Sequence, residues 1–241
     1  MKKLLVLFTA LLTVSAVAQI DRSQQPKPGP APIIQVKEPY QFKLKNGLSV
    51  MVVENRKLPQ VSASLTLDNP PVLEGIKAGL SELTGSLLGK GSKKIAKDDF
   101  YDEVDFMGAS IQVGSSGAFA QSLTRYFPRV FEMMADAAIN PNFTEEEFIK
   151  DRDVIIDGLK ADEKNVTSAA RRVEALLAYG SNHPYGEYTT SETVYNIKLE
   201  DIQRFYDARF RPNNAYLVVV GDIDAATVES LAKKHFKKWK S

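Results

Sequence analysis

The chain has 241 residues, 44% of them hydrophobic and 25% charged, so it is long enough to bury one sizeable core. Its 31 basic and 30 acidic residues give a formal net charge of +1, which offers no electrostatic argument for a nucleic-acid partner or a strongly anionic one. The absence of cysteine excludes disulfides and cysteine-based metal sites or nucleophiles.

The N-terminus has the pattern of a cleavable secretory signal. Lys2 and Lys3 precede the apolar run from Leu4 to Val17, and the small residues at 16–18 fit a cleavage site. The run is shorter than the roughly 20 apolar residues that span a bilayer, so we expect residues 1–18 to be removed and the mature chain to have no transmembrane segment. An uncleaved anchor is the alternative. The short basic start favours a bacterial envelope protein, most simply in the periplasm.

Residues 19–39 are rich in proline and predict an extended leader, and residues 40–241 predict one domain. Three strands are expected within residues 40–68, where Asn46-Gly47 is a strong hairpin signal. Helices are expected at 76–88 and at 97–107, with Asp98 as the cap of the second.

The second half of the chain continues the same alternation of elements. Thr144 followed by Glu147 has the form of a capping box that opens a long helix. The hydrophobic pattern also predicts a hairpin at 110–114 and 118–124, helices at 127–139, 166–179, 199–210 and 225–239, and a strand at 215–220. This order of elements predicts an α+β sandwich with helices packed against one sheet.

Residues 79–92, with the sequence GLSELTGSLLGKGS, resemble the inverzincin pattern G-x-x-H-x-x-E-H-x-x-x-K-G-[ST] of the M16 family, which includes insulinase, pitrilysin and mitochondrial processing peptidase. In such a motif two histidines bind Zn²⁺ and the glutamate is the general base. Here Glu82 stands at the first histidine, Gly85 at the glutamate and Ser86 at the second histidine. Glycine has no side chain, and a neutral hydroxyl is a poor zinc ligand.

A second segment, 151–158 with the sequence DRDVIIDG, resembles the family run E-R-D-V-[IV]-x-x-E that supplies the third zinc ligand. Gly158 stands at that ligand position. Further resemblance lies at 42–50 (FKLKNGLSV), 54–62, 183–186 (HPYG) and 211–222 (RPNNAYLVVVGD), so it covers about residues 40–240. It implies the M16 metallopeptidase-like α+β fold with a mixed, mostly antiparallel sheet, no catalytic residue and no bound zinc.

The resemblance also implies partners, since two such halves face each other around the substrate polypeptide in this family. We expect the partner to be a second M16-like half or chain, and one version of this expectation is a chain with an intact H-x-x-E-H motif. Substrate typically adds as a strand to a sheet edge, and the expected edge is Ala118, Phe119, Ala120, Gln121 and Ser122. One alternative hypothesis is a structural subunit of an envelope complex, and another is an active zinc metalloendopeptidase that recruits metal differently.

Other candidate sites are weaker. The two histidines, His183 and His235, lie in different predicted elements, and we expect a structural role for the first and solvent exposure for the second. The basic C-terminal helix is expected to present a solvated face, with a membrane-surface helix as the alternative. An acidic cluster is expected to face water and consists of Asp151, Asp157, Asp162 and Glu163.

Overall fold

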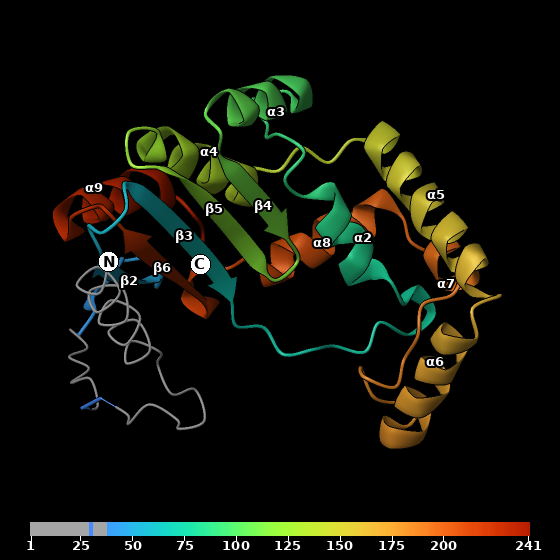
Figure 1. The fold of residues 1–241 in the computed structure, drawn as a ribbon. Helices are drawn as coiled ribbons and strands as arrows, with labels where there is room; N and C mark the ends of the chain where they lie inside the picture. The colour runs from blue at the N-terminus through green and yellow to red at the C-terminus, as the bar shows by residue number, and fades with distance from the viewer. Residues whose placement is uncertain (1–28, 31–37) are drawn as a thin grey trace, which may run out of the picture. The chain divides into compact units, whose positions relative to one another are not determined.

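The computed structural model describes residues 29–30 and 38–241, and six strands in the second range form one sheet. The strands are β1 (Tyr40–Lys43), β2 (Ser49–Glu54), β3 (Gln60–Leu67), β4 (Ser110–Gly114), β5 (Gly117–Leu123) and β6 (Ala215–Gly221). Their order is β1-β2-β6-β3-β5-β4, and all neighbours are antiparallel except the parallel pair β2 and β6 (Figure 1). The expected mixed, mostly antiparallel sheet is therefore confirmed.

The expected signal peptide at 1–18 and most of the leader at 19–39 lie outside the described residues. Residues 38–241 form one compact unit. Among the described residues, no helix has both the length and the apolar character needed to cross a membrane.

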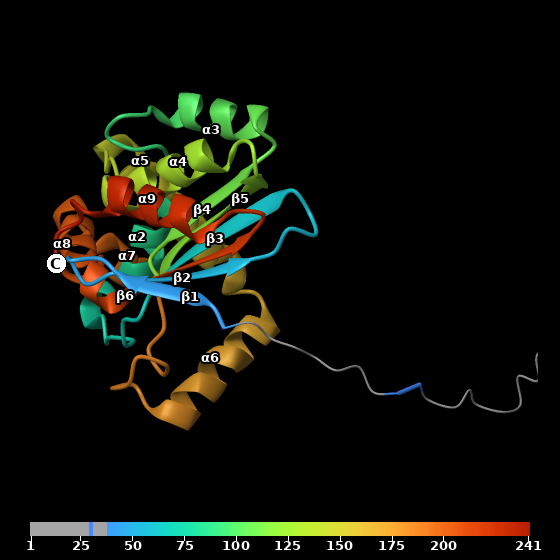
Figure 2. The same ribbon diagram turned by 90° about the vertical axis from the view of Figure 1, so that its left-hand side faces the viewer.

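One face of the sheet forms the main core. Along β3, Val61, Ala63 and Leu65 are buried and alternate with partly exposed residues, which is the period of a half-buried strand. The helices α4 (Phe127–Ile139) and α9 (Ala225–Phe236) cover this face (Figure 2). Phe131 of α4 meets Phe236 of α9 edge to face, with ring centroids 5.7 Å apart.

A second, smaller core lies beside the β4 edge and positions the segment that resembles the zinc helix. It is built by α2 (Leu80–Leu87), α5 (Glu145–Asp162) and the region of α7 (Ser191–Tyr195) and α8 (Leu199–Arg209). Its buried members are Leu83, Leu87, Phe148, Ile197 and Ile202. An isolated helix of eight residues is not stable in water, so α2 depends on its packing in this core.

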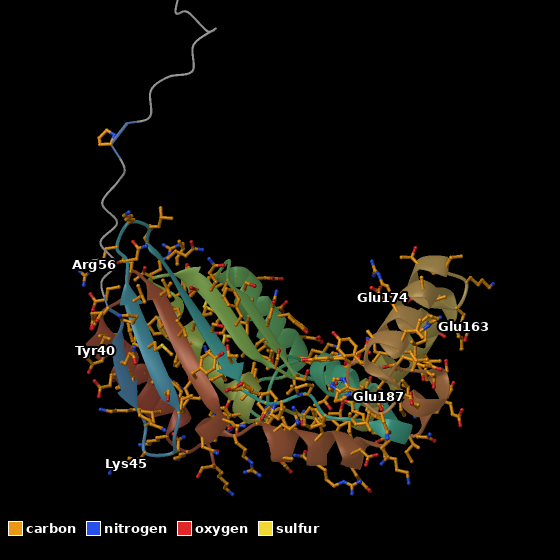
Figure 3. All side chains as sticks on the ribbon, turned by 90° about the horizontal axis from the view of Figure 1, so that it is seen from below. Tyr40, Lys45, Arg56, Glu163, Glu174 and Glu187 are labelled. Carbon is orange, nitrogen blue, oxygen red and sulfur yellow. The ribbon has the colours of Figure 1, made fainter. Side chains whose placement is uncertain are left out.

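The remaining helices are α3 (Lys97–Phe106) and α6 (Val166–Tyr179). The bounds of α6 are those predicted, and none of its residues is buried. It lies at the far end of the unit from the sheet (Figures 1 and 3).

Several sequence predictions need correction. The helix expected at 76–88 is two elements, the 3₁₀ turn η1 (Gly75–Lys77) and α2, because Gly79 adopts a φ of 102° between them. The N-cap of α3 is Ala96 without a side-chain bond, so Asp98 does not cap it. Helix α7 was not predicted. A second 3₁₀ turn, η2 (Pro212–Asn214), precedes β6.

Candidate functional site

The four positions that the resemblance assigns to zinc-binding and catalytic residues lie on two helices that pack against each other. Glu82, Gly85 and Ser86 lie on α2, and Gly158 lies on α5. The two helices pack against each other in the smaller core. The two sequence segments that resemble the family motifs are therefore adjacent through the packing of α2 against α5.

The residues present do not fit a zinc ion. Glu82 is exposed, and the Ser86 hydroxyl donates to the backbone carbonyl of Leu83 at 3.0 Å. A structural zinc site takes four donors and a catalytic one takes three from the protein. Among the described residues, no group of three histidine, aspartate or glutamate side chains converges as a metal site. One carboxylate and one engaged hydroxyl cannot supply either donor set.

The two glycines at family positions have different surroundings. A β-carbon at Gly85 would lie 3.3 Å from the backbone nitrogen of Ser115, which belongs to the turn between β4 and β5. A β-carbon at Gly158 would meet no atom within 4 Å. The hairpin turn therefore closes over the position of the family's general base, whereas the position of the third ligand remains open.

A network of ion pairs joins the end of the first segment to α5. Lys90 Nζ lies 2.5 Å from Asp151 Oδ1 and 2.9 Å from Glu147 Oε2, and Lys97 Nζ lies 2.6 Å from Glu147 Oε1. Hydrogen bonds from Lys97 and then Lys90 lower the pKa of Glu147 to about 2. Burial opposes the charge on Lys90, but the hydrogen bonds to Asp151 and Glu147 outweigh it and raise the pKa of Lys90.

This network corrects two expectations. Asp157 is exposed, as expected for the acidic cluster, but Asp151 is buried and paired with Lys90. The capping box is only half formed, because Thr144 Oγ1 accepts from the Glu147 backbone while the Glu147 carboxylate is bound to the two lysines. The sequence signal for this network was Lys90, which stands at the lysine of the family pattern. The hydrophobic periodicity of the sequence could not predict that Lys90 pairs with residues of α5.

The start of α2 is held by two carboxylates that sequence analysis did not select. Glu74 accepts from the backbone nitrogens of Gly79 and Leu80, each at 2.8 Å, and of Ser81 at 2.9 Å. Glu187 in turn accepts from the backbone nitrogen of Glu74 at 2.9 Å. The bonds to Glu74 satisfy donors that every helix N-terminus leaves free, and they place negative charge at the positive end of the helix dipole, while the bond to Glu187 holds Glu74 in place.

The loop at 183–186 has a structural role, as expected for His183. Its Nδ1 accepts from the Tyr185 backbone nitrogen at 3.2 Å, and its ring stacks on Tyr179 with centroids 5.3 Å apart. A β-carbon at Gly186 would lie 2.0 Å from the Gly180 carbonyl oxygen, so only glycine permits the loop to close.

We expected solvent exposure for His235, and the structure contradicts this. It is partly buried and lies edge-on to Phe131 at 6.2 Å, and this burial lowers its pKa. The lysines of the basic C-terminal segment are exposed, as expected for a solvated face. The segment is fixed to the fold by Trp239, which is buried and donates to the Phe210 carbonyl at 3.0 Å.

The prediction that residues 118–122 form an edge strand of the sheet is wrong. β5, which contains Ala118, Phe119, Ala120, Gln121 and Ser122, pairs with β3 on one side and β4 on the other. Its backbone groups are used within the sheet. The edge beside α2 is β4, and its outer side has no strand partner in the described residues.

Comparisons with known proteins agree with the fold. The family model described as "Insulinase (Peptidase family M16)" matches residues 50–190, and the model described as "Peptidase M16 inactive domain" matches residues 196–241. These observations define a class of protein: an α+β domain of the M16 type whose zinc-peptidase helix lacks the zinc ligands. The chain belongs to peptidase family M16.

Individual relatives are distant and longer. The chain is 26% identical over 212 residues to the zinc protease PqqE of Helicobacter pylori, which covers 82% of this chain and 46% of the relative. It is 26% identical over 223 residues to the mitochondrial-processing peptidase subunit beta of Mus musculus, which covers 90% of this chain and 45% of the relative. The chain thus spans about half the length of these relatives.

A solved structure shows the same fold. The first half of the periplasmic protease PqqL from Escherichia coli matches with a TM-score of 0.68 and 22% identity, over 87% of this chain and 48% of that one.

Proposed function

We propose that this chain is a catalytically inactive M16 half that works as the non-catalytic partner or substrate-holding half of an M16-type peptidase complex in the bacterial periplasm. In this role it contributes no zinc ligand and no general base. The catalytic residues come from a second M16-like half with an intact H-x-x-E-H.

The observation that carries the proposal is the contrast between the support of α2 and its chemistry. The helix is capped by Glu74, packed through Leu83 and tied to α5 through Lys90. The metal-binding and basic groups are missing from the same helix, and the hairpin turn closes over Gly85. A helix that keeps its structural support without its reactive groups favours a binding role over a catalytic one, and that role has to be argued from the surface beside the helix.

The outer side of β4 is the surface that we assign to an extended polypeptide. An unpaired edge strand presents backbone donors and acceptors to which a peptide can add as a further strand. This edge lies against α2, so a peptide bound there runs past the degenerate site. The periplasmic address is supported by the N-terminal pattern and by the fold shared with the periplasmic protease PqqL.

Two measurements test the proposal. The purified protein, incubated with zinc and desalted, is expected to retain no stoichiometric metal and to cleave no fluorogenic peptide. Retention of about one zinc per chain that is lost in Glu82→Ala, with peptide hydrolysis, would establish an active enzyme instead.

The second measurement identifies the partner in intact cells of the source organism. Crosslinking followed by mass spectrometry is expected to recover an M16 chain with an intact H-x-x-E-H. Recovery only of other envelope proteins would favour the structural-subunit alternative and overturn the role in a peptidase complex.

A further inference from the structure

A hollow of about 590 Å³ lies where the first half of α5 meets the end of α7 and the start of α8. We call it the α5–α8 hollow. None of the four degenerate family positions lines it, so it is separate from the site described above. Its volume falls in the range of pockets that bind small ligands, and its lining residues indicate which ligand it fits.

Arg152 lines this hollow and has no hydrogen-bonded anion in the described chain. Its Nε is buried and has no hydrogen-bond partner there. The one ion pair that Arg152 forms with a described residue joins Nε to Asp153 Oδ1 at 3.6 Å, which is longer than a hydrogen bond. Only 24% of the Arg152 side chain is exposed, and a charge withdrawn from water costs free energy unless it is paired. An anion in the hollow would supply the pair that the fold does not.

Two aromatic rings hold the Arg152 guanidinium in place. Its Cζ lies 5.5 Å from the centroid of the Phe148 ring and 5.8 Å from that of the Tyr195 ring. Phe148 precedes Arg152 by four residues on α5, so the two side chains share a helix face, and Tyr195 comes from α7, which packs against α5. A cation within about 6 Å of an aromatic ring is attracted to it. Arg152 is therefore ordered before a ligand arrives, which lowers the entropy that binding costs.

The charges of the lining favour a ligand with a single negative charge. Arg152 and Lys198 are two cations, and Glu145 and Glu200 are two exposed carboxylates, so the lining has no net charge. A dianion such as a phosphate monoester would be repelled by both glutamates. A carboxylate carries one charge and accepts two parallel hydrogen bonds from a planar guanidinium. The terminal Nη nitrogens donate these bonds, because Nε is closed to solvent.

The floor of the hollow is apolar. Phe143 and Leu199 line it and are partly buried against the smaller core. An apolar group that packs on them is removed from water, which adds to its affinity. We propose that the α5–α8 hollow binds a monocarboxylate with an apolar body, whose carboxylate pairs with Arg152 and whose body packs against Phe143 and Leu199.

This inference goes beyond the proposed function, since it requires neither a second M16-like half nor the β4 edge. A carboxylate on an apolar body can come from two sources. One is a small organic acid, and the other is the C-terminus of a polypeptide that ends in an apolar residue. The shared chemistry defines the site, and the choice of probe separates the two sources.

Isothermal titration calorimetry of the purified protein tests the proposal with two acids and their neutral counterparts. The acids are hydrocinnamate and the peptide acetyl-glycyl-phenylalanine with a free carboxyl group, and the counterparts are the two amides. We expect binding of at least one acid and at least tenfold weaker binding of its amide, because the amide loses the charge-assisted hydrogen bonds. The acid that binds more tightly identifies the source. No binding of either acid, or equal binding of acid and amide, overturns the inference.

Substitutions on α5 locate the carboxylate. Arg152→Gln should weaken binding of the acid at least tenfold, and Arg152→Lys should also weaken it, because lysine keeps the charge but lacks the planar fork. Lys150→Gln is the matched control, since it removes one positive charge from the same helix at an exposed residue that does not line the hollow. Equal weakening by Lys150→Gln and Arg152→Gln would indicate a general charge effect and contradict the site.

Two variants at the rim test the site without altering the guanidinium or its aromatic contacts. Lys198 and Glu200 are exposed and line the hollow, so their substitution leaves the core intact. Lys198→Gln should weaken binding of the acid and Glu200→Gln should strengthen it, each by about two- to fivefold, as for exposed charges. Binding of the amides should not change. Effects of the same sign, or no effect of either variant, would place the carboxylate elsewhere and overturn the inference.

Discussion

Lys90 and Asp151 form a partly buried ion pair, 2.5 Å from Nζ to Oδ1, that joins the loop after α2 to the middle of α5. Asp151 Oδ2 is also buried and has no hydrogen-bond partner in the described chain. Lys90 is therefore the group that compensates the charge of Asp151. The two segments by which the chain resembles its family are held together by this pair.

Lys90→Met should destabilise the fold markedly. The variant leaves the Asp151 charge buried without its cation, and breaking such a pair costs about 3–5 kcal/mol when fully buried and less here, because Lys90 is partly exposed. We expect a loss of roughly 2–4 kcal/mol in urea unfolding. Lys93→Met is the control, because Lys93 is exposed, and should change stability by less than about 0.5 kcal/mol. Equal effects would show that the pair contributes nothing specific.

Glu147 should make stability depend on pH in the acid range. Its pKa is lowered to about 2 by Lys97 and Lys90, below the ordinary value of 4.5, so the folded state favours the ionised form. A lowered pKa stabilises above the unfolded value, and the contribution is lost as the pH falls through the folded value. The stability difference between wild type and Glu147→Gln should therefore be largest above about pH 5 and shrink toward about pH 2. A difference that stays constant over this window would contradict the assignment.

Gly158 and Gly85 should respond differently to the same substitution. Replacing a glycine inside a helix with alanine gains about 1 kcal/mol of helix propensity when there is room. Gly158→Ala meets no atom within 4 Å and should stabilise by about that amount. Gly85→Ala presses on the Ser115 backbone at 3.3 Å, so the gain should be smaller or reversed. Thermal unfolding of the two variants side by side measures this, and an equal gain would show that the hairpin turn yields freely.

Glu74→Ala should loosen the start of α2. The variant frees three backbone donors that the carboxylate accepts, and loss of a helix cap costs about 0.5–2 kcal/mol. Glu74→Gln keeps an acceptor and should lose less. Glu82→Ala removes the same charge from the first turn of the helix without a hydrogen bond to the backbone, so it isolates the cap from the helix-dipole effect. Hydrogen exchange of the α2 amides would show where the loss occurs, and unchanged exchange in Glu74→Ala would refute the cap.

The sequence determined the regular elements with strong local signals. The helix at Val166–Tyr179 was predicted at its bounds, and the Asn46-Gly47 hairpin lies where Gly47 adopts a φ of 101°. The sequence also showed that positions 85 and 158 carry glycine, which has no side chain to bind zinc or to act as a base, because the residue type at a position is a property of the sequence alone. Each of these features depends on residues close together in the chain.

Tertiary structure decided the features that depend on distant partners. Both strands of the second hairpin were predicted, but which one lies at the edge is set by the pairing of β5 with β3, some 55 residues earlier in the chain. The burial of Asp151 and the half-buried position of His235 depend likewise on segments brought together by folding. Local sequence patterns determine whether a segment forms a helix or a strand. The segment that packs against each helix face or pairs with each strand edge is determined only when the two cores form.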